Sequence, residues 1–191
     1  MKLEEYGTCE VSLPIPCMPD PFEAKRSIWL PYIRDVLIGE GNNHRSIIVG
    51  HSSGAVAAMR LLEETNIYGA VLISACHTDL GEPNERISGY YPGFKEGSDD
   101  PNPWDFESMK KNSQFVLQFH STDDPFIPIE EADYVAKEIA SVYRRYDDRS
   151  HFFTDKDVDD IIECIHSKCL EFIGKNSAER EDSFVAEMSD L

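Results

Sequence analysis

A serine flanked by glycines follows a short apolar run. Residues 50–54 read Gly-His-Ser-Ser-Gly, a G-x-S-x-G pattern with Ser52 at its centre. A serine oxygen that attacks a carbonyl must stand free at the end of a strand, and flanking glycines let the chain turn there without a Cβ clash. The apolar residues 46–49 and the helix-prone residues 55–64 supply the strand and the helix that the pattern requires. We therefore predict that Ser52 is a nucleophile, with a structural turn as the alternative.

A serine nucleophile needs a base, and the base needs an acid that orients it. In a sheet of parallel strands these groups are expected in the chain order serine, aspartate, histidine, each on a loop after a later strand. Asp123 and Asp124 directly follow the apolar run 114–120, and His151 follows a weaker strand pattern at 141–147. His151 is the predicted base. Chemistry alone leaves either aspartate as the acid, because the other could form the turn or cap a helix.

Four further residues are candidates for the surroundings of this site. The backbone N–H of Ser53, the residue after the nucleophile, is the predicted donor to the oxyanion. The helix that begins there directs its positive end toward the same place. His51 adjoins the nucleophile, and His77 and His120 end predicted strands, so these three histidines are candidates for lining the pocket. None of them follows the acid in the chain order that a base requires.

Buried strands that alternate with helices are predicted to position these residues. Three apolar runs, at 46–50, 68–75 and 114–120, lack polar alternation, as expected for parallel strands covered on both faces. Helical patterns lie between them and around them, and a fourth strand is predicted at 141–147. The pattern predicts an α/β fold with a doubly wound, mostly parallel sheet flanked by helices. The Gly- and Pro-rich stretch 81–106 is predicted to run over the surface.

Composition limits the classes of protein to consider. The 191 residues are 41% hydrophobic, enough for one sizeable core, and we predict one domain over 1–173 and a disordered acidic tail over 174–191. The formal charge of −18 opposes binding to nucleic acid. The five cysteines show no metal or redox spacing, and neither a membrane span nor a signal peptide is evident. We expect a cytoplasmic or nuclear protein without a membrane partner.

Several long stretches together resemble one known family. They read "MPDPFEAKRSIWLPYI", "IIVGHSSGAVAAMR", "VLISACHTDLGEPNERISGYY", "FVLQFHSTDDPFIP" and "SHFF", in order within residues 18–173. They are similar to the family of small serine hydrolases around retinoblastoma-binding protein 9, which have the α/β-hydrolase fold. The resemblance implies Ser52 as nucleophile, Asp124 as acid and His151 as base. It also implies hydrolysis of small ester or amide substrates without a metal or an organic cofactor.

The sequence departs from this family in three places. Family members begin with a strand and a glycine-rich loop that supplies a second oxyanion donor, and no stretch here matches it. We expect this chain to begin in the second strand-helix unit, with residues 7–21 as the second strand and its loop. An alternative is therefore a weakly active or inactive homologue that acts as a binding or regulatory protein. Ser150 stands where relatives often have glycine. No L-x-C-x-E motif occurs, so a retinoblastoma-type partner is not expected.

Overall fold

The computed structural model describes every residue except 1–14, 42, 94–102, 155–157 and 190–191. Residues 16–153 form one compact unit, and the closing helix belongs to a second unit. All the residues predicted to act in the site lie in the first unit.

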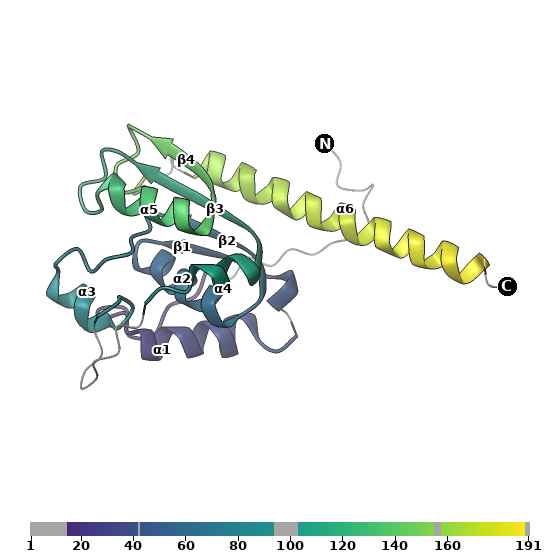
Figure 1. Ribbon diagram of the computed structural model, residues 1–191, viewed down its shortest axis with the longest axis horizontal. Helices are drawn as coiled ribbons and strands as arrows, with labels where there is room; N and C mark the ends of the chain where they lie inside the picture. The colour runs from purple at the N-terminus through teal and green to yellow at the C-terminus, as the bar shows by residue number, and fades with distance from the viewer. Residues whose placement is uncertain (1–14, 42, 94–102, 155–157, 190–191) are drawn as a thin grey trace. The chain divides into compact units, whose positions relative to one another are not determined.

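A parallel sheet of four strands forms the centre of the first unit (Figure 1). The strands are β1 (Ile47–His51), β2 (Ile67–Ile73), β3 (Ser113–Ser121) and β4 (Val142–Tyr146). They lie side by side in the order of the chain, and each pairs in parallel with the next. The predicted strands at 46–50, 68–75, 114–120 and 141–147 are confirmed, and so is the α/β class.

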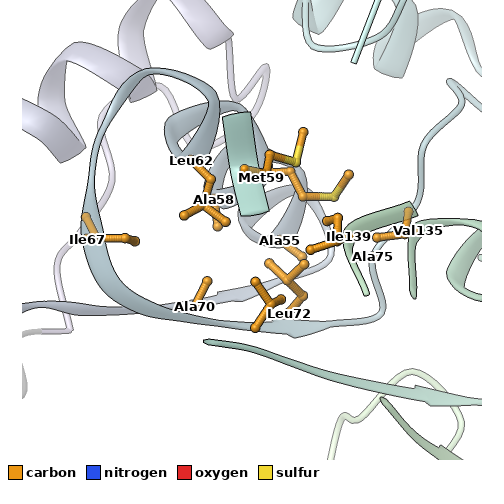
Figure 2. Packing of buried hydrophobic residues seen from close by; sticks show 12 residues of the cluster. Ala55, Ala58, Met59, Leu62, Ile67, Ala70, Leu72, Ala75, Val135 and Ile139 are labelled. Carbon is orange, nitrogen blue, oxygen red and sulfur yellow. The ribbon is translucent and has the colours of Figure 1, made fainter. Parts of the chain in front are cut away.

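Three helices pack their apolar residues against the sheet. They are α2 (Ser53–Glu64), α4 (Phe106–Lys111) and α5 (Ile129–Ile139). Figure 2 shows Ala55, Ala58 and Leu62 of α2 beside Ala70 and Leu72 of β2 in one buried cluster. The opposite side of α2 is buried as well, because it packs against α1 (Arg26–Pro31). A helix that is apolar on all sides needs such burial on both faces.

The helical stretch around Pro31 is irregular. Pro31 ends α1, and the chain continues as a wide helix, η2 (Tyr32–Ile38), before a short turn, η3 (Asn43–Arg45). In the wide turn the Gly39 N–H donates to the Arg34 carbonyl, five residues earlier. Proline has no N–H to donate and its ring crowds the preceding turn, which explains why the regular helix stops there.

The prediction for residues 81–106 is wrong in part. The described residues of this stretch include a short helix, α3 (Pro83–Ser88), followed by Tyr90 and Tyr91, which are both buried. The buried Arg60 donates through Nε to the Tyr90 carbonyl at 2.7 Å. A composition rich in Gly and Pro predicts turns, but two adjacent aromatic side chains supplied enough apolar surface to anchor this segment in the core.

The second unit contains α6 (Asp159–Ser189). The backbone of 174–189 is helical, where a disordered acidic tail was expected, and seven of these sixteen residues are Ala, Glu, Arg or Met, which favour a helix. Residues 7–14 of the expected second strand lie outside the described residues, and 15–21 contain no strand. None of the helices within the described part of the chain is both long and apolar enough to span a membrane.

The two glycines around Ser52 differ in what a side chain would meet. A Cβ added at Gly50 would lie 2.2 Å from the Gly54 carbonyl oxygen, whereas a Cβ at Gly54 would have no atom within 4 Å. The close approach of strand and helix therefore requires glycine at position 50 only, not on both sides of Ser52.

Replacing Gly50 by alanine is expected to lower the free energy of unfolding by about 1–3 kcal/mol or more, because backbone atoms cannot move aside cheaply. Gly54→Ala is the matched control and is expected to be neutral or stabilising by up to about 1 kcal/mol, since alanine favours the helix. Urea unfolding of both variants measures the difference. Equal destabilisation by the two substitutions would contradict the assignment.

Candidate active site

Ser52 lies at the sharp turn between β1 and α2. Its backbone has φ 55° and ψ −122°, an unfavourable conformation for a residue with a side chain. The Ser52 N–H donates to the Ile73 carbonyl at the end of β2 at 2.9 Å, which fixes the turn against the neighbouring strand. Ser53 is the first residue of α2, so its N–H has no acceptor within the helix. The strand, turn and helix predicted around Ser52 are thus present.

Asp124 and His151 are in direct contact. Nδ1 of His151 lies 2.8 Å from Oδ2 of Asp124. The Asp124 side chain has no exposed surface, and that of His151 is 6% exposed. Because a carboxylate only accepts hydrogen bonds, Nδ1 carries the proton, and Nε2 of a neutral ring is left with a lone pair. This is the orientation in which an imidazole can take a proton from a hydroxyl.

Asp124 is stabilised as a carboxylate by several donors. Burial acts to raise its pKa, but hydrogen bonds from His151 and from the N–H groups of Phe126 and Ile127 outweigh it and lower the pKa to about 2. The buried Ser74 also donates its hydroxyl to Oδ2 at 3.0 Å. Ser74 has φ 51°, and the sequence analysis missed it. Its position directly after β2, at the same sheet edge as Ser52, was the available signal.

Asp123 contacts a different part of the histidine loop. Its Oδ1 accepts the Ser150 N–H at 2.8 Å and the Ser121 hydroxyl at 2.5 Å. The same Ser121 oxygen accepts the Arg149 N–H at 3.1 Å. The two adjacent aspartates are thus distinguished by geometry: Asp124 contacts the imidazole of His151, and Asp123 contacts the backbone that precedes it.

The other histidine candidates occupy different environments. His51 donates from Nε2 to the His151 carbonyl at 2.8 Å, and the two ring centroids are 4.7 Å apart. His120 is fully buried, donates to the Ile127 carbonyl and lies 4.0 Å from Oδ2 of Asp124. His120 is therefore buried next to the Asp124 carboxylate and does not line an open pocket. Partial desolvation of the ring against His151 lowers the pKa of His51, and full burial lowers that of His120.

Two exposed phenylalanines flank His151. Phe126 and Phe153 are 60% and 65% exposed, and each ring centroid lies 5.1 Å from that of His151. Phe126 lies two residues after Asp124 and Phe153 two residues after His151, and the sequence analysis did not single them out. They add apolar surface beside the imidazole, where it meets solvent.

His77 belongs to a second histidine-carboxylate pair. Its Nδ1 lies 2.7 Å from Oε2 of Glu131, and its ring stacks on Tyr134. Glu131 also accepts the N–H groups of His77 and Thr78 and the Thr78 hydroxyl. Burial acts to raise the pKa of Glu131, but these hydrogen bonds outweigh it and lower the pKa to about 2. The sequence analysis missed Glu131, because its partners follow a different strand.

Within the described part of the chain, no three His, Cys, Asp or Glu side chains are grouped as metal ligands would be.

A serine at a strand-to-helix turn, with an aspartate-histidine pair on later loops of the same parallel sheet, is the arrangement of serine hydrolases. The family model described as "Serine hydrolase" matches residues 18–163, more than half of the chain, and the chain belongs to this family. The sequence is 43% identical over 135 residues to Serine hydrolase RBBP9 of Rattus norvegicus. The match covers 71% of this chain and 66% of that relative, so the chain spans a little less than two thirds of its length.

Solved structures show the same fold. The ydeN gene product from B. subtilis matches with a TM-score of 0.64 and 20% identity, over 79% of this chain and 78% of that one. Alpha/beta hydrolase domain-containing protein 10 from mouse matches with a TM-score of 0.53 and 18% identity, over 78% of this chain and 70% of that one. The chain therefore has an α/β-hydrolase fold.

Ser150 has φ 49°, a conformation that favours glycine. Replacing it by glycine is expected to raise the free energy of unfolding by about 0.5–1 kcal/mol, because the relief of strain exceeds the entropy that glycine adds to the unfolded chain. The Ser150 N–H bond to Asp123 is retained. Ser150→Ala keeps the Cβ and serves as the control. Thermal unfolding measures both variants, and equal stability of the two would contradict the expectation.

Glu131 is expected to make the free energy of unfolding depend on pH in the acid range. Its pKa in the folded chain is below the ordinary 4.5, so its contribution is complete above pH 4.5 and is lost as pH falls through about 2. Glu131→Gln is expected to cost roughly 1–3 kcal/mol at pH 7, where charged hydrogen bonds are lost. It should also lose less stability than the wild type between pH 5 and about 2.5. Asp124 titrates in the same window in both proteins. Urea unfolding of both proteins at the two pH values makes the comparison. An equal loss of unfolding free energy in wild type and variant would count against the expectation.

Proposed function

We propose that this chain is a serine hydrolase that cleaves small ester or amide substrates through an acyl-enzyme intermediate. In this proposal Ser52 is the nucleophile, His151 the base and Asp124 the acid that orients it. The observation that carries the proposal is the 2.8 Å contact between Nδ1 of His151 and Oδ2 of Asp124. It leaves Nε2 available to receive a proton, at the sheet edge where Ser52 is presented.

The proposed reaction proceeds in two stages. Nε2 of His151 takes the Ser52 hydroxyl proton while Oγ attacks the substrate carbonyl, and the Ser53 N–H donates to the developing oxyanion. His151 then gives the proton to the leaving alcohol or amine, and the acyl group stays on Ser52. In the second stage His151 takes a proton from water, the resulting hydroxide attacks the acyl carbonyl, and the proton returns to Ser52 as the carboxylic acid leaves.

The buried pair supports this mechanism electrostatically. As the imidazole becomes positively charged, a carboxylate at 2.8 Å stabilises it in surroundings from which water is largely excluded. The low pKa of Asp124, about 2, keeps the carboxylate ionised at neutral pH. The first residue of α2 adds the partial positive charge of a helix N-terminus beside Ser52.

The expected partner is a small molecule. With a charge of −18, the chain is expected to repel nucleic acid, and no retinoblastoma-type partner is proposed. Cys17, Cys76, Cys164 and Cys169 are the free cysteines of the described residues, as is usual in the reducing cytoplasm or nucleus, where we propose that the protein acts.

Hydrolysis of para-nitrophenyl acetate tests the proposal. Ser52→Ala and His151→Ala are expected to lower kcat/KM by about 10³-fold or more, and Asp124→Asn by a comparable factor, because the residues act as a unit. Ser27→Ala, which removes a hydroxyl from an exposed position on α1, is the control and should retain the wild-type rate. A cooperatively folded wild type without turnover, or a Ser52→Ala variant with wild-type turnover, would refute the proposal.

A further inference from the structure

The loop that carries His151 has an unfavourable backbone. Ser150 and Phe152, on either side of the histidine, have φ 49° and 57°. Each side chain in this left-handed region costs roughly 1–2 kcal/mol. Such conformations persist only where surrounding contacts enforce them. The position of the imidazole therefore depends on what holds this loop from outside.

Two contacts hold the loop on the side that precedes His151. The Ser150 N–H donates to Asp123 at 2.8 Å, and the Arg149 N–H donates to Ser121 at 3.1 Å. Both acceptors belong to the end of β3 or to the turn after it. Together they fix the approach to the histidine, but neither contacts His151 itself.

His51 forms a hydrogen bond to the backbone of His151 itself. Its Nε2 donates to the His151 carbonyl at 2.8 Å, 100 residues away in the chain. A carbonyl only accepts, so Nε2 of His51 carries the proton. His51 is the last residue of β1 and adjoins Ser52 directly. This hydrogen bond joins the backbone of the proposed base to the residue next to the proposed nucleophile.

The position of His51 is not explained by core packing. The residue as a whole is exposed, unlike the buried Gly50 that precedes it, and only the side of its ring that meets His151 is part-buried. Its ring contacts the rings of His151 and Phe153 at centroid distances of 4.7 Å and 6.4 Å. An exposed side chain is usually free to choose among rotamers, so the hydrogen bond selects one orientation.

We propose that His51 is a positioning residue, which holds the His151 loop against the Ser52 turn through its hydrogen bond to the His151 carbonyl. The inference rests on the proposed function for its catalytic consequence. Loss of the bond lets the strained loop relax, so that the base spends less time aligned with the nucleophile. Substrate binding itself does not require this bond, and kcat should therefore fall while KM remains unchanged.

The two variants His51→Leu and His51→Gln isolate the hydrogen bond. Both remove the imidazole, but glutamine retains an N–H donor at a similar reach and leucine does not. Their first comparison is amide hydrogen exchange of Arg149, Ser150 and Phe152, whose N–H groups are all hydrogen-bonded in the structure. In His51→Leu these amides should exchange roughly 3- to 10-fold faster, as expected for the loss of one hydrogen bond. In His51→Gln most of the protection should return.

The second comparison is turnover of para-nitrophenyl acetate. His51→Leu is expected to lower kcat roughly 3- to 10-fold with KM unchanged, and His51→Gln should recover most of the loss. Equal exchange in leucine variant and wild type, or equal defects in the leucine and glutamine variants, would overturn the proposal. A wild type without turnover would refute the proposed function instead, and the exchange comparison would still decide whether His51 holds the loop.

Discussion

The buried hydrogen bond between Asp124 and His151 is the interaction on which the rest of the site depends. An ionised carboxylate without exposed surface is costly unless several donors surround it. Asp124 receives four: the His151 imidazole, the Ser74 hydroxyl and the N–H groups of Phe126 and Ile127. The Ser74 hydroxyl and the two backbone N–H groups hold the Asp124 carboxylate whether or not the histidine is protonated. They keep it ionised and fix its orientation toward His151.

The parallel sheet explains how distant residues reach that bond. Ser52, Ser74, Asp124 and His151 each follow a different strand, and the ends of parallel strands share one edge of a sheet. Several residues at this edge have left-handed backbones, among them Ser52, Ser74 and Ser150. Strain of this kind is stored where the surrounding structure enforces it. Here the enforcing contacts are hydrogen bonds between neighbouring strand ends, such as that from Ser52 to the Ile73 carbonyl.

Much of this arrangement could be predicted from sequence. β2 and most of β3 were recognisable because a strand buried on both faces needs an uninterrupted apolar run, whereas the largely exposed β4 gave a weaker pattern. The order of serine, aspartate and histidine along such strands then selected Ser52 and His151 but left Asp123 and Asp124 open, and only the resemblance to the serine hydrolase family implied Asp124. The contact of His51 with the His151 carbonyl could not be predicted, because it depends on a loop conformation 100 residues away. The burial of Tyr90 and Tyr91 was missed for a similar reason, since the local composition of a segment does not show which residues distant in the sequence it packs against.

Reaction with a fluorophosphonate probe, followed by peptide mass spectrometry, tests the central claim most directly. The probe attacks a serine only where a neighbouring base activates the hydroxyl. The account predicts that folded protein is labelled at Ser52 and not at the buried Ser74 or Ser121, and that Asp124→Asn slows the labelling strongly. A folded wild-type protein that stays unlabelled at Ser52, or that is labelled equally fast when Asp124 is replaced, would contradict it.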